Sequence, residues 1–168
     1  LRARSPEAIS KTLPPAWHEI QNAGLEMPFS ELFAEPLKRY DLVGEAGRIA
    51  LTMALLSPDY KDAAHMPDLP PLLETLAGSD AVPTDTQDTR DAALVAGLDP
   101  GNARRDLIDM ARNNRMGEAI LRVLVLLEDG AAGDPVALTQ ALATLQAFGL
   151  EDTARRAALQ IVLLERYS

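Results

Sequence analysis

The side chains of this chain that could do metal chemistry are its two histidines and a few closely spaced aspartates. His18 and Glu19 begin like the helix of a zinc protease, in which a second histidine one turn later completes the pair of imidazole ligands. The position that should hold this second ligand is Asn22, so the pair is missing. We therefore predict no catalytic metal on this segment.

A second candidate ligand, His65, stands between Asp62 and Asp68, carboxylates that could orient an imidazole. The prolines around it are more typical of a surface loop with a solvated histidine. Further on, three aspartates recur every three residues: Asp85, Asp88 and Asp91. A calcium loop needs alternating oxygen ligands, a glycine turn and a distal glutamate, which are not arranged here. Acidic residues favoured by the dipole at a helix N-terminus explain the triplet better.

No other motif of a known chemistry is present. The chain has no cysteine, which excludes disulfides, thiolate zinc sites and cysteine nucleophiles. It contains no nucleophile elbow, Walker loop or dinucleotide fingerprint, because Gly44 and Gly47 follow no strand and fall within a helical pattern. We predict no catalytic residue, no cofactor-binding residue, no metal ligand and no cofactor, and hence a protein that is not an enzyme.

Charge and hydropathy disfavour two classes of partner. A net charge of -9 and a pI near 4.7 make nucleic acid and anionic membranes poor partners, because their binders present clustered lysine and arginine. The longest aliphatic run, Val123 to Leu127, is far shorter than the roughly 18 to 20 residues of a membrane span. Lack of cysteine suits cytosol or periplasm, so the compartment stays open. Since the sequence opens at Leu1, we expect that a signal or a larger upstream region has been removed.

The elements that must carry any binding surface begin with a proline-rich N-terminal arm, residues 1–41. Its prolines remove backbone donors and restrict the residues before them, so we predict short helices and no long one. Most of the few aromatic side chains also lie here: Trp17, Phe29, Phe33 and Tyr40. They either pack the arm onto the body of the protein or form an exposed aromatic docking patch.

From residue 42 onward the pattern is helical, with apolar residues at three- and four-residue intervals and proline or glycine between segments. The predicted helices cover residues 42–57, 72–77, 86–96, 103–112, 117–129, 135–148 and 152–166. Asp134 is predicted to cap one helix with Pro135 at its first position, and Asn102 to cap another. No strand-like alternation competes, so the fold class is all-α.

The segment 117–129 is apolar almost all round, which predicts a helix buried between neighbours. On this reading Leu124→Asp should unfold the domain, because it places an uncompensated carboxylate in the core. The last helix is predicted to bury one stripe: Ala154, Ala157, Ala158, Ile161 and Leu164.

A weak internal repeat relates three of these helices. Aligning Gly44-Glu45-Ala46 with Gly117-Glu118-Ala119, and Ala46 with Ala154, pairs several further leucines and alanines. The aligned helices recur at about 35 and 73 residues, close to once and twice the repeat length of helix-turn-helix solenoids. Such hairpins must stack, because one hairpin cannot bury both of its faces.

The stretch from Ala103 to Arg166, with GEAILRVLVLLEDG followed by DPVALTQALATLQAFGLEDTARRAALQIVLLER, resembles the repeat units of tetratricopeptide-like helical proteins of bacterial type. The usual consensus tryptophan, tyrosine and closing proline are absent. The resemblance implies stacked antiparallel helical hairpins, a short α-solenoid over residues 42–168, and a protein-binding scaffold.

We therefore expect a non-enzymatic protein-protein interaction module, possibly the C-terminal part of a longer helical-repeat protein. Two alternatives stay open: an architectural capping or self-association domain, and an all-α enzyme or ligand-binding domain. An exposed apolar groove would favour the interaction module, a broad apolar end face the capping domain, and a closed pocket with convergent polar groups the enzyme. The expected partner is a protein presenting a basic segment near an apolar anchor, or the rest of the same chain.

Overall fold

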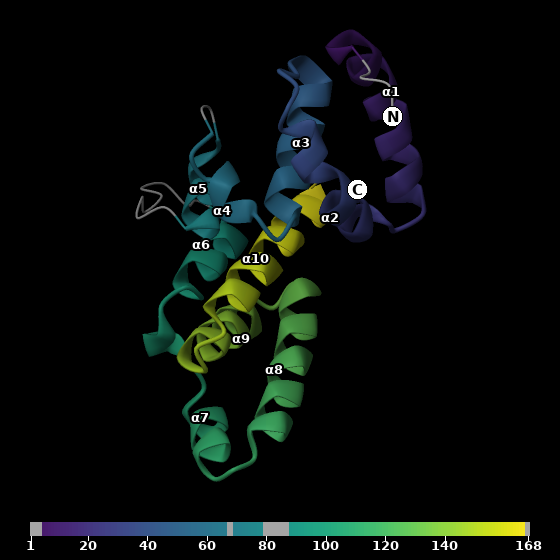
Figure 1. Cartoon of the computed structure of the whole chain (residues 1–168). Coiled ribbons are helices and arrows are strands. Elements are labelled where there is room, and N and C mark those ends of the chain that lie inside the picture. Colours follow the sequence, from purple (N-terminus) through teal and green to yellow (C-terminus); the bar gives the residue numbers. More distant parts are fainter. Residues whose placement is uncertain (1–4, 67–68, 79–87, 167–168) are drawn as a thin grey trace. The chain divides into compact units, whose positions relative to one another are not determined.

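The chain is all-α in the part that this computed structural model describes, residues 5–66, 69–78 and 88–166, where no strand is found (Figure 1). Ten α-helices and one 3-10 turn follow one another along it. They are α1 Pro6–Asn22, α2 Glu26–Leu37, α3 Gly44–Leu56, α4 Tyr60–Ala63, α5 Pro71–Ala77, α6 Thr89–Ala96, η1 Pro100–Asn102, α7 Arg105–Arg112, α8 Met116–Ala131, α9 Pro135–Ala147 and α10 Glu151–Arg166. The predicted fold class is confirmed.

These helices belong to two compact units. The first comprises Leu1–Pro67 together with Leu163–Ser168, and the second is Asp68–Val162. In the first unit α3 packs against both α1 and α2. The boundary expected after residue 41 therefore lies inside the first unit.

The prediction that the N-terminal arm forms only short helices is wrong, because α1 has 17 residues and contains Pro14 and Pro15. Two prolines remove only two backbone donors. The helix still buries a stripe of large side chains at four-residue spacing, Ile9, Leu13 and Trp17, on the side where it packs against α3. Burial of that stripe offsets the lost hydrogen bonds.

The aromatic side chains of the arm join α1 to α2. The Trp17 and Phe29 ring centroids are 6.3 Å apart, and those of Phe29 and Phe33 are 4.6 Å apart, both pairs tilted. Trp17 is buried, whereas Phe33 lies at the exposed edge of this cluster. Trp17 and Phe29 therefore pack two helices of the arm against each other, which neither of the two expectations described.

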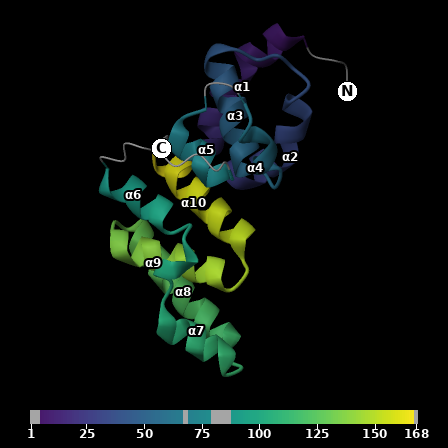
Figure 2. The ribbon, with the colours of Figure 1, turned by 90° about the vertical axis from the view of Figure 1, so that its left-hand side faces the viewer.

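In the second unit the central helix is α9, which contacts α8, α6 and η1 (Figure 2). Its buried residues point in almost every direction: Ala137, Leu138, Ala141, Leu142, Ala143, Thr144 and Leu145. As predicted, the Asp134 carboxylate caps the helix, accepting hydrogen bonds from the backbone N–H groups of Val136 at 2.9 Å and Ala137 at 3.1 Å. Gly149, with φ +76°, takes the left-handed conformation that ends it.

This cap yields a first testable prediction. Asp134→Ala removes the acceptor of two N–H groups that have no intrahelical partner, so we expect a loss of about 1 kcal/mol in the free energy of unfolding. Asp134→Asn, which keeps a capping oxygen, should recover most of the loss. Urea denaturation followed by circular dichroism measures both variants, and an Asp134→Ala protein as stable as the wild type would contradict the assignment.

The turn before α7 differs from the prediction. Asn102 does not cap α7; its side-chain amide donates to the carbonyl of Ala96, at the end of α6, over 2.9 Å. The residue that flanks α7 is Arg104, whose backbone N–H donates to the Thr144 hydroxyl oxygen at 3.0 Å. The Asn102 side chain therefore closes the preceding helix. The predicted start of α6 at Thr86 lies outside the described residues.

A glycine allows α8 and α9 to approach closely. A Cβ atom placed on Gly130 would lie 2.6 Å from the Cα and 2.8 Å from the backbone nitrogen of Leu138. No side chain fits there unless the backbone of α9 moves. Gly117, near the start of the same helix, has no such neighbour within 4 Å.

Candidate docking groove

The helix predicted to be buried on all sides is exposed along one face. In α8 the buried residues are Ala119, Val123 and Gly130, which lie on one side of the helix. On the opposite side, Leu121 is 64% exposed, Leu124 50% and Val125 57%. The prediction of burial between neighbours is therefore wrong. The physical reason is that α9, and not α8, is the central core helix of the unit, and α8 packs against α9 with one side only.

An open apolar groove runs beside this exposed face. Its walls are formed by Leu124, Leu127 and Ala131 of α8 and by Ala157 and Ile161 of α10, and it encloses about 310 Å³. Glu128 and Gln160 are its polar residues. The apolar residues therefore dominate a space wide enough to take part of a partner side chain or backbone.

The buried side of α10 also differs from the sequence prediction. Ala154 and Ala158 of α10 are buried as expected, but Ala157, Ile161 and Leu164 are only half-buried. Leu159 and Val162 are buried in their place. The buried stripe is thus rotated around α10, which leaves Ala157 and Ile161 facing the groove.

Charged side chains are distributed unequally along α8. Near its start, Glu118 forms ion pairs with Arg115 and, at 2.9 Å, with Arg122. The hydrogen bond from Arg115, and after it the separate hydrogen bond from Arg122, lowers the pKa of Glu118 and favours its ionised carboxylate. Near its end, Glu128 and Asp129 have no basic partner among the described residues. The charged side chains at the start of the helix are therefore paired with one another, whereas the two carboxylates near its end are not paired within the described part of the chain.

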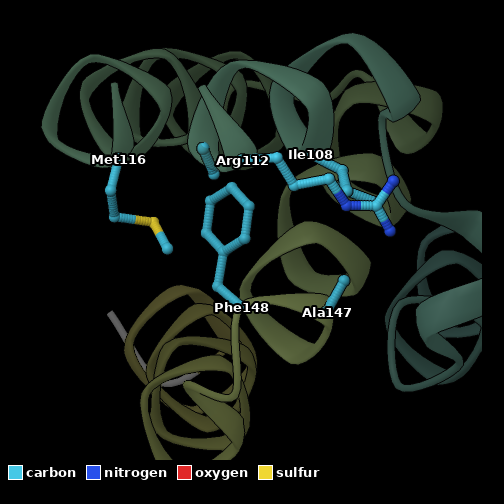
Figure 3. Close-up of a pocket in the computed structure, with 6 residues that line it drawn as sticks. Ile108, Arg112, Met116, Ala147 and Phe148 are labelled. Atoms are coloured by element: carbon cyan, nitrogen blue, oxygen red, sulfur yellow. The ribbon is translucent and has the colours of Figure 1, made fainter. Parts of the chain in front are cut away.

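A second, smaller hollow in the same unit lies between α7 and the end of α9 (Figure 3). It has a volume of about 260 Å³ and is lined by Ile108, Ala111, Arg112, Met116, Ala147 and Phe148. Figure 3 shows the Phe148 ring and the Met116 side chain pointing into it. The Arg112 guanidinium is an exposed partner of Asp109 at 3.5 Å. No set of polar groups converges here.

A larger hollow of about 470 Å³ lies in the first unit, between α2, the following loop and α3. Its charged lining residues are Lys38, Arg39 and Asp41, and the Lys38 ammonium is held by Glu35 at 3.0 Å and by Asp62 at 3.2 Å. The hydrogen bond with Glu35 is the chief reason that the pKa of Lys38 is raised. Because both partners are carboxylates of the same unit, this lysine is committed to internal pairing.

The residues singled out for metal chemistry do not gather in space. His18 is exposed on α1 and His65 is exposed after α4. Asp88 caps α6 by accepting the Arg90 N–H at 2.9 Å, and Asp91 lies in the first turn of that helix, as the macrodipole reading predicts. Asp68 and Asp85 lie outside the described residues. Within the described ranges, no three histidine, aspartate or glutamate side chains are placed to hold a metal ion.

Compared with known proteins, the chain matches no family model, no curated protein and no solved structure. The site must therefore be argued from its own residues. Among the helices that the structure describes, none is long and apolar enough to cross a membrane.

The residues that sequence reasoning missed are those of the exposed α8 face and the groove. A run of apolar residues has no periodicity that marks a solvent side, so the sequence of 117–129 predicts burial for Leu121, Leu124 and Val125 as well. The available signal was Glu128, since it lies on the same side of the helix as Leu121 and Leu124. A charged residue in line with apolar ones indicates that this side reaches the surface.

Proposed function

We propose that this chain is a non-enzymatic protein-interaction module, and that it docks its partner on the α8 face and the adjoining groove. We call this surface, made of Leu121, Leu124, Val125, Leu127, Ala157 and Ile161, the α8 docking face. The observation that carries the proposal is the exposure of three large apolar side chains on one side of α8, beside an apolar hollow. Contiguous apolar surface of this kind is more typical of binding sites than of ordinary protein surface.

The alternative functions have weaker support. An all-α enzyme or ligand-binding domain would need a pocket with convergent polar groups, whereas the groove and the hollow between α7 and α9 have at most two polar lining residues each. A capping or architectural role needs a broad apolar end face, whereas the exposed apolar residues of α8 follow the side of a helix. The capping role therefore stays the second proposal.

The helical-repeat reading is part of the same proposal. Its support is local: α7 contacts α8, α8 contacts α9, and the three aligned alanines Ala46, Ala119 and Ala154 are all buried. The alignment also pairs Leu124 with Leu159, which is buried in α10. On this reading, the face of α8 that carries Leu124 is equivalent to the face of α10 that carries Leu159. Neighbouring helices bury this face in α10, and in α8 a binding partner would bury it instead.

Site-specific cross-linking in the native host tests the proposed function. A photo-crosslinking amino acid at position 125 should capture a protein upon irradiation, because Val125 lies within the α8 docking face. The matched control is position 136, since Val136 is also an apolar residue of the same unit and is 62% exposed on α9.

We expect adducts at position 125 to exceed those at position 136 by about tenfold, and Leu121→Asp in the same chain to abolish them. Equal labelling at both positions would refute the docking face. If the amino acid at position 125 is cross-linked to a small molecule and to no protein, the interaction module itself is refuted.

A further inference from the structure

We propose that the occupant of the α8 docking face is the α8 helix of a second copy of this chain, with the two helices antiparallel. This inference rests on the proposed function, because it names the partner of the same surface. The partner then carries a basic side chain, Arg122, three residues before the apolar anchor Val125 and therefore beside it on the helix surface.

The first argument is the shape of the apolar face. Leu121, Leu124 and Val125 are three and four residues apart, which places them on one side of the helix as a short ridge. Gly117, one turn before Leu121, adds no side chain to this side, so another helix can come close there. Ridges of this spacing pack against the grooves of an identical helix.

The second argument is the charge along the helix. The first half of α8 and the residue before it carry Arg115, Glu118 and Arg122, a net charge of +1, and the second half carries Glu128 and Asp129, a net charge of -2. A parallel pair would bring like charges together and is unfavourable. An antiparallel pair brings each basic half beside the acidic half of the other copy.

The register follows from these positions. Arg122 and Glu128 are each three residues from Val125, on either side of it. When two antiparallel helices are centred on Val125, Arg122 of one copy lies beside Glu128 of the other, and two-fold symmetry forms this pair twice. Glu128 has no internal basic partner among the described residues, so it is available for the pair. Arg122 donates one hydrogen bond to Glu118 of its own helix, and its guanidinium has further N–H groups for a second carboxylate. An interface of this kind uses the same surface on both copies and closes as a dimer.

Sedimentation equilibrium of the full 168-residue chain and its variants tests the inference. The wild type should show a monomer-dimer equilibrium. Val125→Asp should raise the dimer Kd by at least about tenfold, since it places two carboxylates at the centre of the pair. Val136→Asp, an equally drastic change at an exposed valine outside the surface, should leave the Kd unchanged.

A charge exchange makes the test specific to the antiparallel register. Arg122→Glu and Glu128→Arg should each raise the Kd, because each brings like charges together in both symmetric pairs. The double variant with both changes should restore the Kd to within about threefold of the wild type, because it rebuilds both pairs with the signs reversed. Circular dichroism melting of every variant separates loss of association from loss of folding.

Two results would overturn the inference: a wild type that stays monomeric up to about 1 mM, a concentration at which even weak specific pairs associate, or a double variant no better than the single ones. The cross-link at position 125 then separates the two proposals. A dimer-sized adduct of the chain with itself supports both. An adduct with a different protein, from a monomeric chain, refutes the second copy as occupant and leaves the docking function intact. No protein adduct from a monomeric chain refutes both.

Discussion

Leu142→Asp is expected to unfold the second compact unit, whereas Leu124→Asp is expected to leave it folded. Leu142 has no exposed surface at the centre of α9, so an aspartate there places a carboxylate without a partner in the core. The cost is several kcal/mol, comparable to the stability of a whole domain. Leu124 is 50% exposed, and an aspartate at that position can stay in water at a cost of about 1 kcal/mol or less.

Far-ultraviolet circular dichroism during thermal unfolding distinguishes the two variants. Leu142→Asp should lose a large part of the helical signal at room temperature, and Leu124→Asp should melt within a few degrees of the wild type. If Leu124→Asp unfolds instead, α8 is buried on all sides and the docking face does not exist. That result is the one that the apolar composition of α8 alone would have predicted.

Gly130→Ala is expected to destabilise the protein, although alanine is the better helix former. The added Cβ would lie 2.6 Å from the Cα of Leu138, so α8 and α9 must separate. Such overpacking costs about 1 to 3 kcal/mol and exceeds the gain of about 0.5 to 1 kcal/mol from helix propensity. We expect a net loss of about 1 kcal/mol, or a fall in Tm of roughly 5 °C.

The matched control is Gly117→Ala, in the same helix. No atom lies within 4 Å of the added methyl group, so only the propensity gain remains and Tm should stay equal or rise. Equal effects of the two substitutions on Tm would mean that the close contact between α8 and α9 does not stabilise the unit.

Where a helix has capping, proline or glycine residues at its ends, the sequence predicted its bounds well. For α9, Asp134 and Pro135 marked the start and Gly149 the end, and the structure places the helix between them. These residues act on backbone groups only a few positions away. Their effect can therefore be predicted from the sequence without knowing the rest of the fold. The prolines of α1 misled the prediction because their cost is local, whereas the compensating burial of Leu13 and Trp17 depends on α3, far along the chain.

The docking face could not be predicted from sequence for a related reason. Exposure of α8 is set by which of two apolar helices, α8 or α9, lies at the centre, and both carry enough alanine, leucine and valine for that position. Gly130 lies on the side of α8 that α9 approaches closely, and Leu121 and Val125 lie on the opposite, exposed side. The exposed face of α8 therefore depends on its contact with α9, and the periodicity of the α8 sequence alone does not reveal this contact.

The aromatic cluster of Trp17 and Phe29 has a consequence for spectroscopy. Every tryptophan and tyrosine of the chain belongs to the first compact unit, and Phe148 is the sole aromatic residue of the second. Intrinsic fluorescence therefore follows the unfolding of the first unit alone, through the buried Trp17, whereas the amide signal follows both. A difference between the two melting curves would give the stability of each unit without any label. Substitutions in α8 or α9 should shift the amide curve and leave the tryptophan curve in place wherever the units unfold independently.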